Sequence, residues 1–151
     1  MDAKCPDHNG TAPGSEQTYI QAMASFEGDG GCIAEARRVA TAFLGEARLG
    51  HGVPVSVRAV DVTQLVVSEL VTNARKYAPG PVLMDLRIVG EILEIAIWDS
   101  GPHLPVVHSA DPERLGRHGL EIVTALVESY RVSMEPVGKC VTVRIPLREA
   151  R

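Results

Sequence analysis

Two short runs of alternating apolar residues, joined by Gly90-Glu91, constrain the fold of this chain more than any other feature. The first run covers Val82 to Ile88 and the second covers Ile92 to Trp98. Alternation with a period of two is typical of strands that bury one face. A glycine in a two-residue connection favours a β-hairpin. The two runs therefore predict an antiparallel hairpin with one covered face.

The remaining patterns place helices before this hairpin and a second hairpin after it. Two long runs of helical period, Cys32 to Leu49 and Val57 to Tyr77, are each stopped by a segment rich in Gly and Pro. The other expected elements are a strand over Tyr19 to Phe26, a helix over Leu120 to Tyr130, and a closing hairpin of Arg131 to Glu135 and Lys139 to Leu147. This order predicts an α+β fold, a two-layer α/β sandwich with helices on one face of a mostly antiparallel mixed sheet.

Composition limits the classes of protein to be considered. The chain has 151 residues, 45% of them hydrophobic, which suits one domain over residues 17–151 after a polar, disordered tail at 1–16. A net charge of −4 gives no electrostatic reason to expect nucleic acid as a partner. No apolar stretch approaches the roughly 18–20 residues that span a membrane. Cys5, Cys32 and Cys140 form no CxxC motif, so we expect free thiols and a cytoplasmic protein without a zinc site.

In the helical run Val57 to Tyr77, two polar side chains fall where apolar ones are expected. Glu69 and Asn73 lie one turn apart, near the middle of a stripe formed by Val62, Leu65, Val66, Leu70 and Tyr77. Burying a carboxylate and an amide costs several kcal/mol, as an order of magnitude, unless partners satisfy them. The pair is therefore either a functional site or a buried Glu–Asn pair bonded to each other or to nearby backbone.

Two further segments carry polar groups at the ends of elements. Asp99-Ser100-Gly101-Pro102 follows a buried strand, and its carboxylate can accept a hydrogen bond from an exocyclic amine such as that of adenine; Asp also favours ordinary turns. In Leu115 to Val123, glycines precede an apolar helix whose backbone N–H groups suit phosphate oxygens, and Arg117 adds a charged donor. The alternative for the second segment is that its glycines only mark the boundary between a loop and a helix.

Together the three segments resemble the GHKL (histidine-kinase-like) ATPase/kinase superfamily, which includes histidine kinases, gyrase B subunits and anti-sigma-factor serine kinases. Residues 69–78 resemble its N box, residues 99–102 its G1 box and residues 116–120 its G2 box, and the likeness covers about residues 18 to 148. The resemblance implies the Bergerat-type ATP-binding fold, with ATP and Mg²⁺ as cofactors.

The resemblance also implies roles for single residues. Asn73 would hold a Mg²⁺ ion that bridges the ATP phosphates, Glu69 would be the general base, and Asp99 would receive the adenine amine. The further nucleotide-binding residues that it implies are Lys76 and Tyr77 of the N box, Gly101 of the G1 box, Arg117, His118, Gly119 and Leu120 of the G2 box, and, near the end of the chain, Thr142 or Cys140 as support for adenine.

The sequence departs from the family pattern in two places. His103 stands where the G1 box usually has a second glycine, and the G2 box keeps only Gly116 and Gly119 of its glycines. Both changes bear on nucleotide affinity more than on the fold.

Within the superfamily, a single domain with so short a leading segment resembles the anti-sigma-factor serine/threonine kinases. That resemblance implies a sigma factor and an anti-sigma-factor antagonist protein as partners, and a homodimer, with transcription as the regulated process. The alternative is a degenerate or nucleotide-free switch that acts through protein contacts alone. A free-standing ATP hydrolase is a third possibility.

Overall fold

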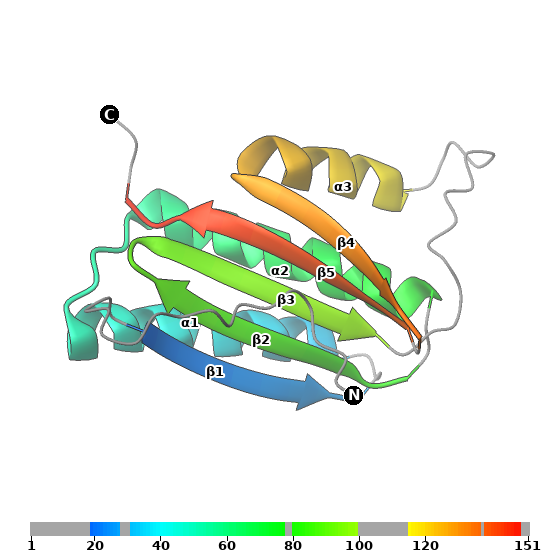
Figure 1. Cartoon of the computed structure of the whole chain (residues 1–151), viewed down its shortest axis with the longest axis horizontal. Coiled ribbons are helices and arrows are strands. Elements are labelled where there is room, and N and C mark those ends of the chain that lie inside the picture. The colour runs from blue at the N-terminus through cyan, green and yellow to red at the C-terminus, as the bar shows by residue number, and fades with distance from the viewer. Residues whose placement is uncertain (1–18, 28–30, 78–79, 100–114, 137, 149–151) are drawn as a thin grey trace.

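The computed structural model describes residues 19–27, 31–77, 80–99, 115–136 and 138–148, which form two layers (Figure 1). A five-stranded sheet makes one layer, and three helices cover one of its faces. The elements in chain order are β1 (Tyr19–Phe26), α1 (Cys32–His51), α2 (Val57–Tyr77), β2 (Val82–Val89), β3 (Ile92–Asp99), α3 (Leu115–Leu126), β4 (Ser129–Glu135) and β5 (Gly138–Pro146). The predicted α+β fold class is confirmed.

The strands lie in the order β1-β2-β3-β5-β4, and all four pairings between them are antiparallel. The predicted hairpin is present as β2 and β3, with Val89 opposite Ile92. Gly90 has a φ of 66° in the two-residue turn between them, and Glu91 does not have a positive φ. This pattern fits a type II′ turn, in which glycine occupies the first central position.

The helix α3 differs most from the sequence expectation. It begins at Leu115 and ends at Leu126, whereas the apolar pattern predicted a helix from Leu120 to Tyr130. The early start brings both glycines of the G2 box inside the helix, although glycine disfavours helical backbone by about 1 kcal/mol relative to alanine. The chain after Leu126 turns into β4 at Ser129.

The hydrophobic core lies between the helices and the inner face of the sheet. In β2 every second residue is fully buried, and in β3 the residues opposite them are buried as well. The central inner-face residues are Met84, Leu86, Ile95, Ile97 and Val143. In Figure 1 the helices lie side by side behind the sheet, α2 in the middle with α1 and α3 on either side.

The middle helix, α2, begins with a side-chain cap. The Ser56 hydroxyl accepts a hydrogen bond from the backbone N–H of Ala59 at 3.0 Å, which satisfies one donor of the first turn. Among the side chains of this helix whose burial the structure describes, one polar side chain lies in the core: Thr63, whose hydroxyl is buried and has no hydrogen-bond partner. An unpaired buried hydroxyl loses its hydration without compensation.

We therefore expect Thr63→Val to raise the free energy of unfolding by about 1 kcal/mol, because valine keeps the shape and removes the unpaired hydroxyl. Urea denaturation followed by circular dichroism measures the change. Thr72→Val, at an exposed position of the same helix, is the matched control and should give no such gain. A loss of stability in Thr63→Val would mean that the hydroxyl makes a favourable contact after all.

A partly buried tyrosine in the sheet should make the stability of the protein depend on pH in the alkaline range. Tyr130 in β4 lies opposite Val143 and packs against the core, and burial raises its pKa above the ordinary value of 10.0. The unfolded chain then loses this proton at a lower pH than the folded chain does. Stability linked to Tyr130 is complete below about pH 10 and is lost as pH rises through the higher folded-state pKa.

The corresponding prediction compares wild type with Tyr130→Phe. Above about pH 10 the wild-type free energy of unfolding should fall more steeply than that of the variant, because only the wild type carries this titration. Urea denaturation series between pH 8 and 12 measure both slopes. If the free energy of unfolding fell equally steeply with pH in both proteins, the raised pKa of Tyr130 would not be the cause of the loss in stability.

Two observations bear on the cysteines and on the predicted absence of a membrane-spanning segment. Cys32 keeps its thiol, which is buried, Cys140 is disulfide-bonded, and Cys5 lies outside the described residues. The prediction of free thiols is therefore wrong for Cys140. Within the described segments, no helix has both the length and the apolar character that crossing a bilayer requires.

Candidate functional site

The helix α2 carries Glu69 and Asn73 on the flank that faces away from α1. The Gln64 side chain donates a hydrogen bond to the Thr41 hydroxyl at 3.0 Å, which fixes one flank of α2 against α1. At 100° per residue, Glu69 and Asn73 fall on the other flank. Because α3 is the second helix in contact with α2, this flank is the side of α2 toward α3 (Figure 1).

The position of these two side chains differs in detail from the sequence prediction. The fully buried stripe of α2 consists of Ala59, Val62, Thr63, Val66, Val67, Leu70, Val71 and Ala74. Glu69 and Asn73 lie at its margin, each only partly buried, and Leu65 is 37% exposed. The stripe thus turns toward α1 and the sheet, and the polar pair lines its edge.

Within the described residues, neither Glu69 nor Asn73 makes a side-chain hydrogen bond or ion pair. The alternative of a Glu–Asn pair bonded to itself or to nearby backbone is therefore not what the structure contains. Two partly buried polar groups, one turn apart and oriented toward the neighbouring helix, remain available to a ligand.

Asp99 lies at the same end of the molecule as the C-terminal turns of α2. It is the last residue of β3 and pairs in register with Val82, the first residue of β2, which follows closely after the end of α2 at Tyr77. In Figure 1 the arrowhead of β3, the C-terminal end of α2 and the first turn of α3 all lie at the right-hand side. The described parts of the three predicted boxes therefore lie at the same end of the sandwich.

The Asp99 carboxylate is not an isolated acceptor. Lys139 of β5 lies opposite it in register, and its ammonium donates to the Asp99 carboxylate at 2.6 Å. Both side chains are buried, with 4% of Asp99 and 7% of Lys139 exposed. Sequence reasoning missed Lys139, because only the pairing of β3 with β5 brings it to Asp99.

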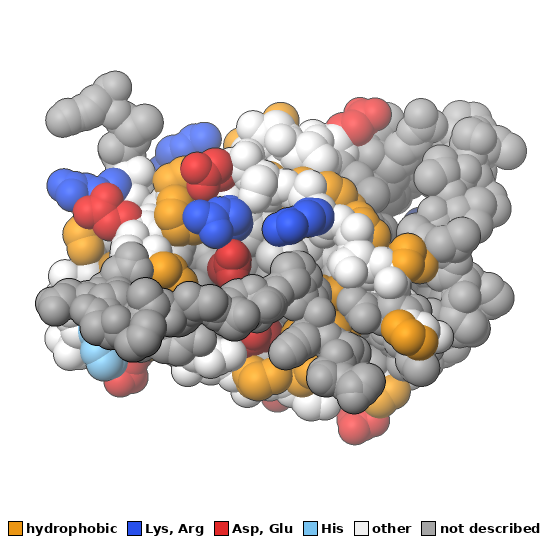
Figure 2. Space-filling model, viewed as in Figure 1, with side chains coloured by type: hydrophobic (Ala, Val, Ile, Leu, Met, Phe, Trp, Pro, Cys, Tyr) orange, Lys and Arg blue, Asp and Glu red, His pale blue; other side chains and the backbone are white. Residues whose placement is uncertain are grey.

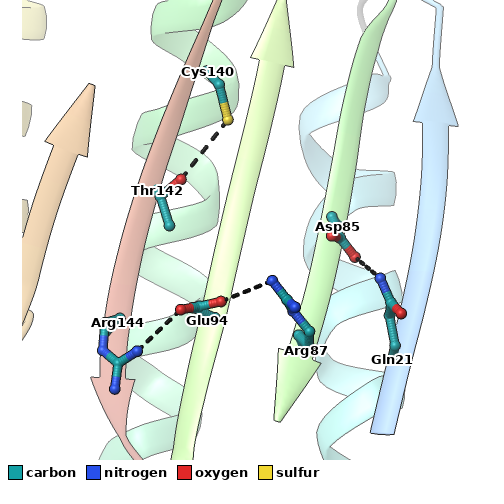
Figure 3. A network of polar contacts seen from close by, with 7 residues as sticks. All are labelled: Gln21, Asp85, Arg87, Glu94, Cys140, Thr142 and Arg144. Carbon is teal, nitrogen blue, oxygen red and sulfur yellow. Dashed lines mark hydrogen bonds and ion pairs between the residues drawn. The ribbon is translucent and has the colours of Figure 1, made fainter. Parts of the chain in front are cut away.

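Thr142, predicted to support adenine, does not belong to this site. Thr142 pairs with Ala96 and Cys140 pairs with Trp98, so both lie on the outer face of the sheet, opposite to the face that carries Asp99. Figure 3 shows Thr142 and Cys140 on that face, where the Thr142 hydroxyl lies 3.8 Å from the Cys140 sulfur. The prediction that either residue supports adenine is therefore wrong. Neighbouring side chains on a strand point to opposite faces of the sheet, and Thr142 and Cys140 are on the face that does not carry Asp99.

The remaining predicted residues are placed only in part. Lys76 is exposed in the last turn of α2, and Tyr77 ends that helix. Arg117 lies in the first turn of α3, where backbone N–H groups lack intrahelical acceptors. The later residues His118, Gly119 and Leu120 continue the same helix, and their contact with phosphates stays a prediction. Gly101 lies outside the described residues.

The outer face of the sheet has a separate polar network. Glu94 accepts from Arg87 at 3.1 Å and from Arg144 at 3.0 Å, so one carboxylate joins β2, β3 and β5 (Figure 3). Gln21 and Asp85 extend the contacts to β1 at 2.9 Å. Figure 2 shows basic and acidic side chains close to one another in the middle of the face in view. The residues of the network are separated from Asp99 by the thickness of the sheet.

The donors at the helical side suit Mg²⁺ better than a transition metal. The described residues contain no group of three or more His, Cys, Asp or Glu side chains that could hold a metal ion. Mg²⁺ needs less from the protein, since it is usually held by one or two protein oxygens together with substrate phosphates and water. The amide oxygen of Asn73 meets that requirement.

Comparison with known proteins gives one family. A family model described as "Histidine kinase-like ATPase domain" matches residues 29–145, which include α1, α2, α3 and the strands β2 to β4. A comparison with curated proteins finds no match.

Proposed function

Because the chain belongs to the histidine kinase-like ATPase domain family, we propose that it is an ATP- and Mg²⁺-dependent serine/threonine protein kinase of the anti-sigma-factor type. It would bind a sigma factor and phosphorylate an antagonist protein, and so regulate transcription. The observation that carries the proposal is the pair of unpartnered polar side chains, Glu69 and Asn73, on the flank of α2 toward α3. A structural role for that pair would require partners.

In this proposal three residues of α2 have separate roles in phosphoryl transfer. Asn73 offers an amide oxygen to Mg²⁺, and the ion, when bound, neutralises phosphate charge. Glu69 accepts the proton of the serine or threonine hydroxyl as its oxygen bonds to the γ-phosphorus atom, while the bond from that phosphorus to ADP breaks and ADP leaves. Lys76, in the last turn of the same helix, adds positive charge near the phosphates. Such positioning and charge neutralisation are what phosphoryl transfer requires of a protein.

The base of the nucleotide would be held at the end of β3. Asp99 is buried there, and a buried carboxylate is a strong acceptor for an exocyclic amine. Its ion pair with Lys139 shows that this acceptor already has a donor in the structure. The residues thus fit the triphosphate and the metal ion directly, and they fit adenine only in competition with Lys139.

That competition favours a second candidate function, a switch that binds nucleotide weakly or not at all and acts through protein contacts. A site whose main acceptor is paired with a residue of its own chain does not depend on ATP to be stable. The retained Glu69 supports the kinase instead, since a protein that only binds partners needs no general base.

A transfer assay distinguishes the two functions. Purified protein is incubated with Mg²⁺ and ATP labelled at the γ-phosphate, together with candidate antagonist proteins from the same organism. The kinase proposal expects label on a serine or threonine of the antagonist, abolished by EDTA and by Asn73→Ala. Binding of an antagonist or sigma factor without any transfer, at millimolar ATP, would support the switch.

A further inference from the structure

The ion pair between Asp99 and Lys139 is the most unusual polar contact among the described residues. Only three described polar residues are buried, namely Thr63, Asp99 and Lys139, and two of them form this pair. Lysine is almost never fully buried unless it is paired. The short 2.6 Å contact, at the last register position of β3 with β5, supplies that pairing.

The two charges stabilise each other at a place where the proposed nucleotide would need one of them. In the proposed function the Asp99 carboxylate receives the amine of adenine. A charged ammonium is a stronger donor to a carboxylate than a neutral aromatic amine is. To bind, adenine has to displace Lys139 or share the carboxylate with it, and displacement leaves a buried ammonium without its counter-charge.

We propose that Lys139 is an affinity-determining residue that competes, within the chain, with the adenine amine for Asp99. The inference rests on the proposed function, in that it assumes a nucleotide site at Asp99. Lys139 keeps the site stable without a ligand and lowers the affinity for adenine nucleotides. It acts through Asp99 and takes no part in phosphoryl transfer.

The proposal predicts two opposite effects of removing the Lys139 ammonium: the free protein becomes less stable, and its affinity for adenine nucleotides rises. Removing the ammonium leaves Asp99 as a buried carboxylate without its charged partner, which destabilises the free protein. The adenine amine can then take the place of the ammonium on that carboxylate, so part of the lost stabilisation returns when the nucleotide binds. A merely structural ion pair would give the loss of stability without the gain in affinity.

The test compares wild type with Lys139→Met, using the non-hydrolysable imido analogue of ATP in the presence of Mg²⁺. Calorimetric titration should show binding at least about tenfold tighter in the variant, equivalent to about 1.4 kcal/mol. Thermal unfolding of the variant without ligand should occur at a lower Tm, and saturating nucleotide should raise its Tm by more than it raises the wild-type Tm.

Two controls identify the cause of the gain. Purine riboside triphosphate lacks the exocyclic amine and has no other N–H donor on that edge of the base, so Lys139→Met should not gain affinity for it, whereas a general change in charge or access would affect both nucleotides. Arg87→Met breaks a partly buried ion pair with Glu94, 3.1 Å long and on the opposite face of the sheet. It should lower the Tm and leave the affinity for the ATP analogue unchanged.

Lys139→Gln keeps the proposal testable if the Met variant does not fold. Its amide still donates to Asp99 but carries no charge, and its affinity for the ATP analogue should lie above that of wild type. Equal affinities in wild type and the lysine variants would overturn the role of Lys139 and leave nucleotide binding intact. An equal gain for purine riboside triphosphate would overturn it as well. No binding by wild type or any variant at millimolar nucleotide would overturn both this role and the proposed kinase.

Discussion

Glu69→Gln is expected to bind Mg-ATP as tightly as wild type and to lose phosphoryl transfer by roughly 10²–10⁴-fold, the usual contribution of a general base. Glutamine keeps the length and shape of the side chain and cannot take a proton. Because Glu69 makes no hydrogen bond or ion pair within the described residues, the change should have little effect on the fold. Single-turnover transfer at saturating ATP measures the loss, and calorimetry measures the affinity.

Two variants of the same helix show whether the effect is specific. Asn73→Ala should weaken Mg-ATP binding itself, since it removes the proposed metal ligand. Asp61→Asn, at an exposed position of α2, removes a carboxylate without touching the site and should change neither quantity. If Glu69→Gln lowered the Tm and left the transfer rate intact, Glu69 would be a structural carboxylate and the mechanism would be wrong.

Asp99→Asn is expected to lower the free energy of unfolding by about 3–5 kcal/mol, the usual result of removing one partner of a buried ion pair. The cause is Lys139, which stays buried without its counter-charge. The same change should weaken adenine-nucleotide binding, because an amide is a poorer acceptor than a carboxylate for the base amine. Urea denaturation and nucleotide titration measure the two effects separately.

The double variant Asp99→Asn with Lys139→Met separates the two roles of Asp99. Replacing both members of a buried ion pair by uncharged groups is often close to neutral for stability, so most of the lost stability should return. Nucleotide affinity should stay low, since the carboxylate is still missing. Recovery of affinity in the double variant would show that Asp99 is not the acceptor for the base.

Hydrophobic periodicity alone predicted the bounds of an element wherever that element buries one face along its whole length. The bounds of α2 and of the hairpin β2–β3 were predicted to within a residue, because every second or every third to fourth side chain enters the core. The start of α3 was missed because two glycines near its beginning disfavour a helix locally. Its fit between α2 and the edge of the sheet depends on tertiary packing, which no local pattern contains.

The site was predictable where it depends on one element and unpredictable where it depends on two. Glu69 and Asn73 were found from a single helical stripe, and Asp99 from a single strand end. The partner of Asp99 follows from the register between β3 and β5, which places Lys139 opposite it. The outward direction of Thr142 could have been read from β5 itself, because Val141, Val143 and Ile145 alternate with Thr142 and Arg144 and the apolar set faces the core.

The position of β1 in the sheet has a consequence for biosynthesis. β1 pairs with β2, and the whole of α1 and α2 lies between them in the chain. A ribosome therefore releases this strand long before its partner exists. The eight residues of β1, YIQAMASF, include no charge and no proline, which are the features that usually discourage an open strand from pairing with other chains. The nascent chain is thus most exposed to aggregation between the synthesis of β1 and that of β2, and slow translation of the helices would prolong that interval.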